Sequence, residues 1–222
     1  MNERHLATFR RHMVELIEIQ VEIAADELGK DALDPRVMAT MAVVPRHEFV
    51  PPPLRAHAYE NSPLPIGMGK TISQPFIVAV MTDLLDARAD HVVLEVGTGL
   101  GYQAAILADL VRQVWSVEIV EELATEAEAR LAELGIDNVT IRVGDGSHGW
   151  AEHAPFDRIL VAAAAPAVPP DLLRQLRPGG RLVMPTGKGD GQRITVVDKD
   201  ASGQTRERSL LAVRFSELET VR

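Results

Sequence analysis

The chain has 222 residues, of which 46% are hydrophobic and none is cysteine. This length accommodates one large α/β domain or two small domains. The lack of cysteine excludes disulfides, thiolate metal sites and cysteine nucleophiles. The formal net charge is −9, and the 23 basic residues are scattered among acids. Nucleic-acid binding is therefore not expected, because it requires basic patches that neutralise phosphates.

Membrane insertion is not expected either. No run approaches the roughly 18 to 20 uninterrupted apolar residues that a membrane span requires. The stretch that begins with Met1–His5 is charged and amphipathic, unlike a secretory signal. We therefore expect a cytoplasmic protein, a monomer or weak oligomer, that acts on a protein or small-molecule substrate.

Residues 1–88 are predicted to form N-terminal helices and a lid over substrate and cofactor. Apolar residues recur at helical spacing over 3–29, and Gly29 is suited to end that helix. Asp34 is placed to cap a second helix that runs to about Ala42. Pro51–Pro53 is expected to prevent regular structure, so residues 51–75 are predicted to be an ordered, loop-rich lid. A helix over 76–87 follows.

From residue 91 the predicted strands and helices alternate. Strands are expected at 91–96, 114–118, 139–143, 157–162 and 181–185, and helices at 101–112, 120–134 and 169–176. Two further apolar runs, 193–198 and 209–215, are candidates for antiparallel strands. This order predicts an α/β fold over 89–222 with a doubly wound, mostly parallel, seven-stranded sheet, with the whole chain in one compact domain.

A glycine-rich turn follows the first predicted strand of this sheet. Gly97, Gly99 and Gly101 come shortly after Glu95, and glycine permits positive φ and a close approach of ligand to backbone. A dinucleotide-binding fingerprint would need glycine at position 102, where the chain has tyrosine. The spacing is instead E-x-G-x-G-x-G, which resembles that of class I methyltransferases dependent on S-adenosylmethionine.

Two more acidic residues follow the second and third strands. Glu118 lies 23 residues after Glu95, where doubly wound folds place an acid that accepts hydrogen bonds from ribose hydroxyls. Asp145 lies between Gly144 and Gly146, where its carboxylate is suited to accept a hydrogen bond from the exocyclic amine of adenine. A simple Asp-Gly turn is the alternative interpretation of Asp145.

The fourth strand is followed by Ala162–Pro166, which contains no aromatic and no polar residue. Amino-group methyltransferases of nucleic acids usually carry stacking and hydrogen-bonding residues at this position, which hold a flipped base. A small apolar wall instead suits the close approach of a peptide or a carboxylate. Because only Asp145 supplies a carboxylate near this strand end, we predict no metal site.

Seven motifs together resemble those of the protein-L-isoaspartate O-methyltransferases. They occur in the expected order over roughly residues 35–215, at Val44–Val50, Leu64–Gly67, Thr71–Pro75, Glu95–Tyr102, Gly144–Gly146, Pro155–Asp157 and Leu176–Gly180. The Thr-Ile-Ser-x-Pro element at 71–75 is highly specific for this family. Three features depart from the family pattern: Leu100 replaces a usual serine, Ser216-Glu217 replaces a usual Val-Pro, and the predicted N-terminal helix is longer than is typical.

The resemblance implies a role for each matched position. The active-site serine corresponds to Ser73. The cofactor-binding positions correspond to Thr71, Ile72, Glu95, Gly97, Thr98, Gly99, Gly101, Glu118, Ile119, Asp145 and Gly146. The substrate-binding positions correspond to Pro65, Ile66, Gly67, Val213 and Arg214.

The activity implied by this resemblance is methylation of the carboxylate of L-isoaspartyl residues in damaged proteins and peptides. S-adenosylmethionine would supply the methyl group and leave as S-adenosylhomocysteine, and the ester would start repair to aspartate through a succinimide. Two alternatives stay open. One is a related carboxyl methyltransferase that acts on aspartate of a dedicated peptide, and the other is an S-adenosylmethionine-binding module without catalysis.

Overall fold

A seven-stranded sheet forms the centre of the computed structural model, which describes residues 3–221. Its strands are β3 (Val92–Val96), β4 (Gln113–Glu118), β5 (Val139–Val143), β6 (Phe156–Val161), β7 (Leu176–Thr186), β8 (Arg193–Lys199) and β9 (Thr205–Ala212). They lie in the order β5-β4-β3-β6-β7-β8-β9. Neighbours from β5 to β7 are parallel, whereas β8 is antiparallel to β7 and β9. The predicted mostly parallel sheet is confirmed.

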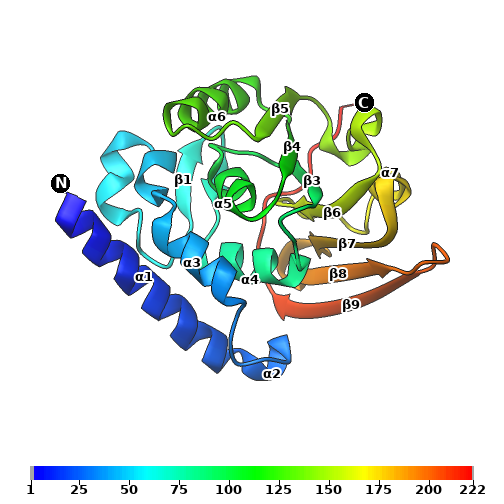
Figure 1. Ribbon diagram of the computed structural model, residues 1–222, viewed down its shortest axis with the longest axis horizontal. Coiled ribbons are helices and arrows are strands. Elements are labelled where there is room, and N and C mark those ends of the chain that lie inside the picture. Colours follow the sequence, from blue (N-terminus) through cyan, green and yellow to red (C-terminus); the bar gives the residue numbers. More distant parts are fainter. Residues whose placement is uncertain (1–2, 222) are drawn as a thin grey trace.

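Helices cover both faces of the sheet (Figure 1). They are α1 (Glu3–Ile23), α2 (Ala25–Leu28), α3 (Pro35–Val43), α4 (Pro75–Leu85), α5 (Tyr102–Leu110), α6 (Glu121–Glu133) and α7 (Pro170–Gln175). Strand side chains alternate between two apolar clusters, as the pleat requires. Val93 belongs to the cluster that includes residues of α4 and α5, whereas Leu94 belongs to the cluster that includes Leu172 of α7. This alternation accounts for the doubly wound arrangement.

The strand order reverses at β3, which pairs with β4 on one side and with β6 on the other. The carboxyl ends of these three parallel strands therefore lie next to one another. In open α/β sheets, ligands bind outside the carboxyl ends of the strands at such a reversal. The fold thus places the loops after Val96, Glu118 and Val161 around one position.

The segment between α3 and α4 is more regular than the sequence predicts. Pro52–His57 forms a 3₁₀ helix, because its prolines occupy the first turn, where a missing N–H removes no hydrogen bond. Strands β1 (Leu64–Gly67) and β2 (Lys70–Ile72) form an antiparallel hairpin. Met68 and Gly69 at its turn have φ values of 50° and 70°, as a two-residue hairpin turn requires. The expectation that the prolines prevent regular structure is therefore wrong.

Several boundaries also differ from those predicted. The helix expected over 3–29 divides at Ala24 into α1 and α2, and Gly29 ends α2 in the left-handed conformation. Asp34 caps α3 as predicted, since its side chain accepts a hydrogen bond from the Arg36 backbone N–H. Strand β7 begins at Leu176 rather than at the predicted residue 181, and Pro178–Gly180 form an irregularity within that strand.

The N-terminal helices pack onto the sheet domain rather than apart from it. Helix α1 contacts α3 and α4, and it lies along the outer edge of the molecule (Figure 1). Buried residues from α1, such as Met13, share one apolar cluster with Val93 of the central strand. The division into 1–88 and 89–222 stays a prediction, and its outermost residues 1, 2 and 222 lie outside the described part of the chain.

Candidate active site

A cleft with a volume of about 550 Å³ lies at the carboxyl ends of β3, β4 and β6. Its walls come from the β1–β2 hairpin, the loop after β3, the end of β4 and the small residues Ala162 and Ala163 after β6. The segment 212–221 is here called the C-terminal tail, and its residues 212–219 form a further part of the wall. The volume falls within the roughly 300–1,000 Å³ range of small-molecule sites.

The glycine loop after β3 needs its glycines for backbone conformation. Gly97, Gly99 and Gly101 have φ values of 91°, 55° and 95°, which side-chain-bearing residues rarely adopt. Gly97 and Gly99 line the cleft, whereas Gly101 is buried at the start of α5. An added Cβ at Gly101 would lie 3.4 Å from Ala127 Cβ of α6, so this glycine serves packing as well as turning.

Glu118 brings its carboxylate to the cleft from the end of β4. The residue is only 5% exposed, and it lines the cavity. Its Oε2 accepts a hydrogen bond from the Gly99 backbone N–H at 2.8 Å, and its Oε1 accepts one from the Val120 N–H at 3.0 Å. A carboxylate has about four lone-pair sites, so Glu118 retains capacity to accept from ligand hydroxyls.

Glu95 lies beneath the glycine loop and does not line the cleft. It is fully buried, and it accepts a short hydrogen bond from Ser116 Oγ. Ser116 Oγ is also 2.6 Å from Thr98 Oγ1, so a polar chain links Glu95 to the loop. Burial raises the pKa of Glu95 to about 8, against the lowering effect of the Ser116 hydrogen bond. Glu95 is therefore mainly protonated at neutral pH and supports the loop from below.

Asp145 lies beside the cleft, and only its neighbour Gly146 forms part of the wall. Both carboxylate oxygens are engaged, because Oδ1 accepts from the Ser147 N–H at 2.9 Å and Oδ2 from the Val221 N–H at 2.8 Å. Partial burial raises the pKa of Asp145, but these hydrogen bonds outweigh it, and the pKa lies below its usual range. The Asp145 carboxylate, which the sequence predicts to accept from an adenine amine, thus accepts here from Val221 at the end of the C-terminal tail.

Ser73 lies between β2 and α4 and lines the cleft. Ser73 also borders a second, smaller cavity of about 60 Å³ beside the cleft, together with Ile72, Thr98 and Leu100. Thr71 lines both cavities. The helix after Ser73 begins at Pro75, and Asn61 Oδ1 accepts the Phe76 backbone N–H at 3.0 Å. Proline at the first turn and this side-chain cap together place Ser73 at the cleft.

The predicted substrate-binding positions divide into two groups. Ile66, Val213 and Arg214 line the cleft. Pro65 and Gly67 belong to the same hairpin as Ile66, but they are exposed and lie outside the wall. Ile119 of the predicted cofactor-binding set also lines the cleft.

Several residues of the site are not predicted from the sequence. Lys70 and Glu219 both line the cleft, and their side chains form an ion pair that joins the hairpin to the C-terminal tail. The tail also pairs with the end of β6, since Ala164 N–H donates to Ser216 O at 2.8 Å and Leu218 N–H donates to Ala164 O at 2.7 Å. Because these are backbone contacts, the Ser216-Glu217 departure leaves the tail in place. Contacts between residues so distant in sequence leave no local pattern.

The donors and acceptors of this cleft fit S-adenosylmethionine. A buried carboxylate at Glu118 suits ribose hydroxyls, the glycine backbone at 97 and 99 permits close approach of a ligand, and apolar walls suit the remainder. Within residues 3–221, no group of three or more His, Asp or Glu side chains is arranged to hold a metal ion. In the same part of the chain, no helix combines the length and apolar character that a membrane crossing requires.

Known proteins with similar sequences share one description. A protein-family model described as protein-L-isoaspartate(D-aspartate) O-methyltransferase matches residues 23–221. Protein-L-isoaspartate O-methyltransferase 2 of Syntrophobacter fumaroxidans is 59% identical over 207 residues, which are 93% of this chain and 84% of that protein. Protein-L-isoaspartate O-methyltransferase 1 of Polaromonas sp. is 52% identical over 219 residues, which are 99% of this chain and 93% of that protein.

Solved structures agree with these sequence matches. A protein-L-isoaspartate O-methyltransferase superposes with a TM-score of 0.79 at 26% identity, over 94% of this chain and 65% of that chain. A putative protein-L-isoaspartate O-methyltransferase from Plasmodium falciparum, in complex with S-adenosyl-L-homocysteine, superposes with a TM-score of 0.73 at 24% identity, over 85% of this chain and 92% of that chain. The latter likeness supports the fold alone. With a family model that covers most of its length and relatives above half identity, this chain belongs to the protein-L-isoaspartate O-methyltransferase family.

Proposed function

We propose that this protein transfers the methyl group of S-adenosylmethionine to the carboxylate of L-isoaspartyl residues in damaged proteins and peptides. The observation that carries the proposal is that Ser73 and Glu118 border the same cleft. The first is the serine that the family motif assigns to the active site, and the second is the acid suited to ribose. Relatives that bear the name of this activity are more than 50% identical over most of the chain.

When bound, S-adenosylmethionine supplies an electrophilic methyl group on a positively charged sulfur. The residues that would hold it are Gly97, Gly99, Glu118, Ile119 and Gly146, which line the cleft. Glu118 would accept hydrogen bonds from the ribose hydroxyls through the lone pairs that Gly99 and Val120 leave available. Glu95 and Thr98 act less directly, by supporting the glycine loop.

The remaining wall residues orient the substrate and exclude water. A carboxyl group with an ordinary pKa near 4 is already an anion at neutral pH, so no general base is needed. The Ser73 hydroxyl would donate a hydrogen bond that orients this carboxylate rather than act as a nucleophile. Ile66, Ala162 and Phe215 supply apolar surface around it. Exclusion of water favours neutralisation of an anion by a cation, and fixed orientation removes much of the entropic barrier.

The consequence of this chemistry is repair. By the chemistry of the family, the methyl ester of an isoaspartyl residue collapses to a succinimide, which hydrolyses partly to normal aspartate. We further propose a cytoplasmic enzyme that is a monomer or weak oligomer and needs neither nucleic acid nor membrane. The lack of cysteine agrees with a compartment in which disulfides are not formed.

A direct experiment is the measurement of base-labile methyl esters on an isoaspartyl peptide and on its aspartyl twin of the same sequence. The proposal expects esters on the isoaspartyl peptide without added metal and little on its twin. Preferential labelling of the aspartyl peptide would point to the dedicated-peptide alternative. Binding of S-adenosylhomocysteine without methyl transfer to either peptide would point to a non-catalytic binding module.

A further inference from the structure

Arg46 is buried next to the segment that carries Ser73. It lies in the 3₁₀ helix η1 (Arg46–Phe49), within the Val44–Val50 motif. Its exposure is 0%, although arginine is a residue type that is rarely buried completely. Nothing in the proposed chemistry uses this residue so far, so its burial needs a physical reason.

The guanidinium of Arg46 connects three segments of the site. Its Nη2 donates a hydrogen bond to the Ser73 carbonyl oxygen at 2.7 Å. Its Nε donates to the Ala58 carbonyl oxygen at 2.8 Å, at the end of the 3₁₀ helix that precedes the hairpin. Its central carbon lies 4.8 Å from the ring centre of Tyr102, the first residue of α5 after the glycine loop. One planar group thus contacts two separate parts of the lid, at Ser73 and at Ala58, and the first residue of α5, Tyr102.

Packing alone does not account for an arginine at this position. Burial lowers the pKa of Arg46 to about 10, so the side chain still carries its charge at neutral pH. Its Nη1 is buried and has no hydrogen-bond partner among the described residues. A buried charge with an unsatisfied donor is costly, and apolar side chains of similar volume commonly stabilise such positions better. The geometry of the guanidinium therefore matters more than its volume.

We propose that Arg46 is a positioning residue for methyl transfer: it fixes the backbone at Ser73, so that the serine hydroxyl meets the substrate carboxylate in one orientation. This assignment rests on the proposed function. A rigid fork that donates to two carbonyls on different segments cannot be replaced by the single ammonium of lysine. Asn61 already holds the following residues through Phe76, so Arg46 supplies the second fixed point of the segment.

The test is a double-mutant cycle with Arg46→Lys, Ser73→Ala and the double variant, assayed on an isoaspartyl peptide. We expect Arg46→Lys to lower kcat about 10- to 100-fold, the scale of one misplaced catalytic contact. Its KM and its affinity for S-adenosylhomocysteine should stay within about threefold. Because Arg46 acts through Ser73, the double variant should lose no more activity than Ser73→Ala alone. Additive losses would overturn the proposal.

Arg158 provides a matched control. It is also buried, and its side chain donates to the carbonyls of Leu85, Asp86 and Asp157, near the amino-terminal part of β6. Arg158→Lys should lower thermal stability as Arg46→Lys does, but it should leave kcat unchanged at a temperature where both variants are folded. Equal losses of kcat in the two variants would show that Arg46 is merely structural.

Hydrogen exchange tests the same assignment without any activity. In the free protein, Arg46→Lys should speed exchange across residues 71–77 by about 2- to 13-fold, the factor that corresponds to the loss of one hydrogen bond, and Arg158→Lys should not. If Arg46→Lys does not fold, Arg46→Gln takes its place in the cycle and in the exchange measurement. Unchanged exchange over 71–77 in a folded variant would contradict the proposal. A wild-type protein that is inactive on isoaspartyl peptides would count against the proposed function, while the exchange result would still decide the role of Arg46.

Discussion

Glu118 Oε2 accepts the hydrogen bond of the Gly99 backbone N–H at 2.8 Å, so the acid at the end of β4 holds the glycine loop that follows β3. The same carboxylate borders the cleft. One side chain therefore holds the loop and also faces the cleft. This coupling gives a structural reason for the two motifs to occur together.

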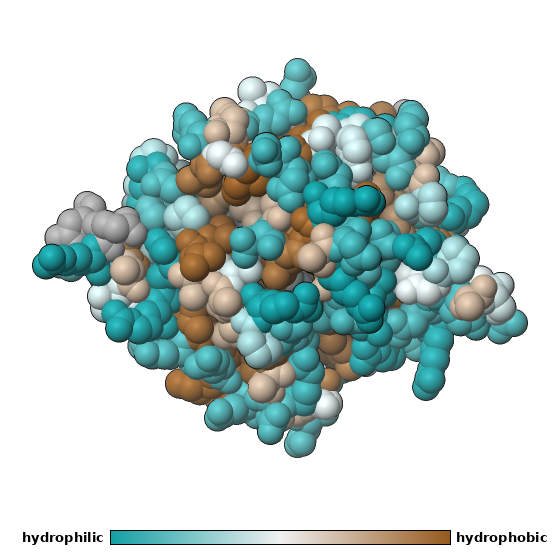
Figure 2. Space-filling model, viewed as in Figure 1, coloured by the Kyte–Doolittle hydropathy of each residue, from teal (hydrophilic) through white to brown (hydrophobic). Residues whose placement is uncertain are grey.

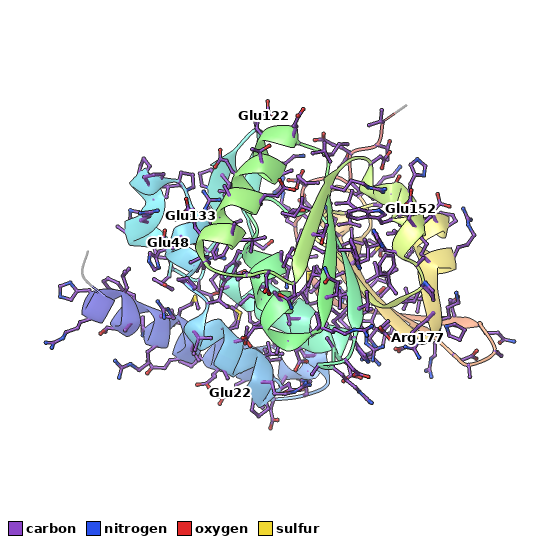
Figure 3. The ribbon with its side chains drawn as sticks, turned by 45° about the horizontal axis from the view of Figure 1, so that its top comes forward. Glu22, Glu48, Glu122, Glu133, Glu152 and Arg177 are labelled. Carbon is purple, nitrogen blue, oxygen red and sulfur yellow. The ribbon has the colours of Figure 1, made fainter. Side chains whose placement is uncertain are left out.

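Glu118→Ala should weaken binding of S-adenosylhomocysteine. Two lost hydrogen bonds to ribose hydroxyls correspond to about 1–3 kcal/mol, or roughly 5- to 150-fold in affinity. Calorimetry measures this change. Glu122→Ala is a suitable control, because Glu122 lies on the exposed first turn of α6 and points away from the sheet (Figure 3). Wild-type affinity in the Glu118→Ala variant would remove Glu118 from the binding site.

Ser73→Ala should separate catalysis from cofactor binding. If the hydroxyl only orients the substrate carboxylate, methyl transfer should fall about 10- to 1000-fold, the scale of one positioned hydrogen-bond donor. The affinity for S-adenosylhomocysteine should stay within a few-fold. Turnover of an isoaspartyl peptide and calorimetry on the same preparation give both values. Wild-type turnover in this variant would leave Ser73 as an ordinary loop residue.

Glu95 should make the stability of the protein depend on pH. Burial raises its pKa to about 8 from 4.5, so between these values the folded protein holds a proton that the unfolded chain has lost. The free energy of unfolding should therefore fall as the pH rises through this window, by up to about 1.4 kcal/mol per pH unit. Above about pH 8 both states are ionised, and the contribution no longer changes.

Glu95→Gln removes this titration while it keeps a neutral polar side chain of similar shape. Urea unfolding of both proteins at several pH values between about 5.5 and 7.5 isolates the contribution of Glu95. The wild type should lose stability relative to the variant as the pH increases. Parallel curves for the two proteins would show that Glu95 has an ordinary pKa in the folded state.

The central sheet can be predicted from sequence because its signal is local. Val92–Val96 and Phe156–Val161 are buried on both faces, and such strands appear as short apolar runs. The glycines at 97, 99 and 101 mark the turn because positive φ leaves few alternatives. The sequence places strand β9 too late in the chain, because its first residues, Thr205–Arg208, form an exposed edge without an apolar pattern.

The parts of the site that escape prediction depend on contacts between distant residues. The sequence places Glu95 at the cofactor, but Ser116 and Thr98 show that it lies below the loop. The hairpin gives no clear signal because its turn uses a non-glycine residue, Met68, at positive φ. Arg46 reaches Ser73 across 27 residues of sequence, and no spacing rule connects them.

The surface adds little to the prediction of the site. Hydrophilic residues cover most of the face shown in Figure 2, with scattered hydrophobic residues between them.

The ion pair between Lys70 and Glu219 should restrain the C-terminal tail beside the cleft. The side chain of Glu219 is 57% exposed, so solvent screens the pair, and exposed pairs contribute about 0.2–1 kcal/mol. Lys70→Gln should therefore speed hydrogen exchange over residues 213–221 by about 1.4- to 5-fold, the factor that corresponds to this energy. High salt should reduce the difference from the wild type, because salt screens exposed charges. Lys188→Gln removes an exposed lysine outside the cleft wall and should leave exchange in the tail unchanged. If Lys70→Gln exchanges at the wild-type rate in low salt, the tail is held by its other contacts, which are the hydrogen bonds to Ala164, Gln192 and Asp145.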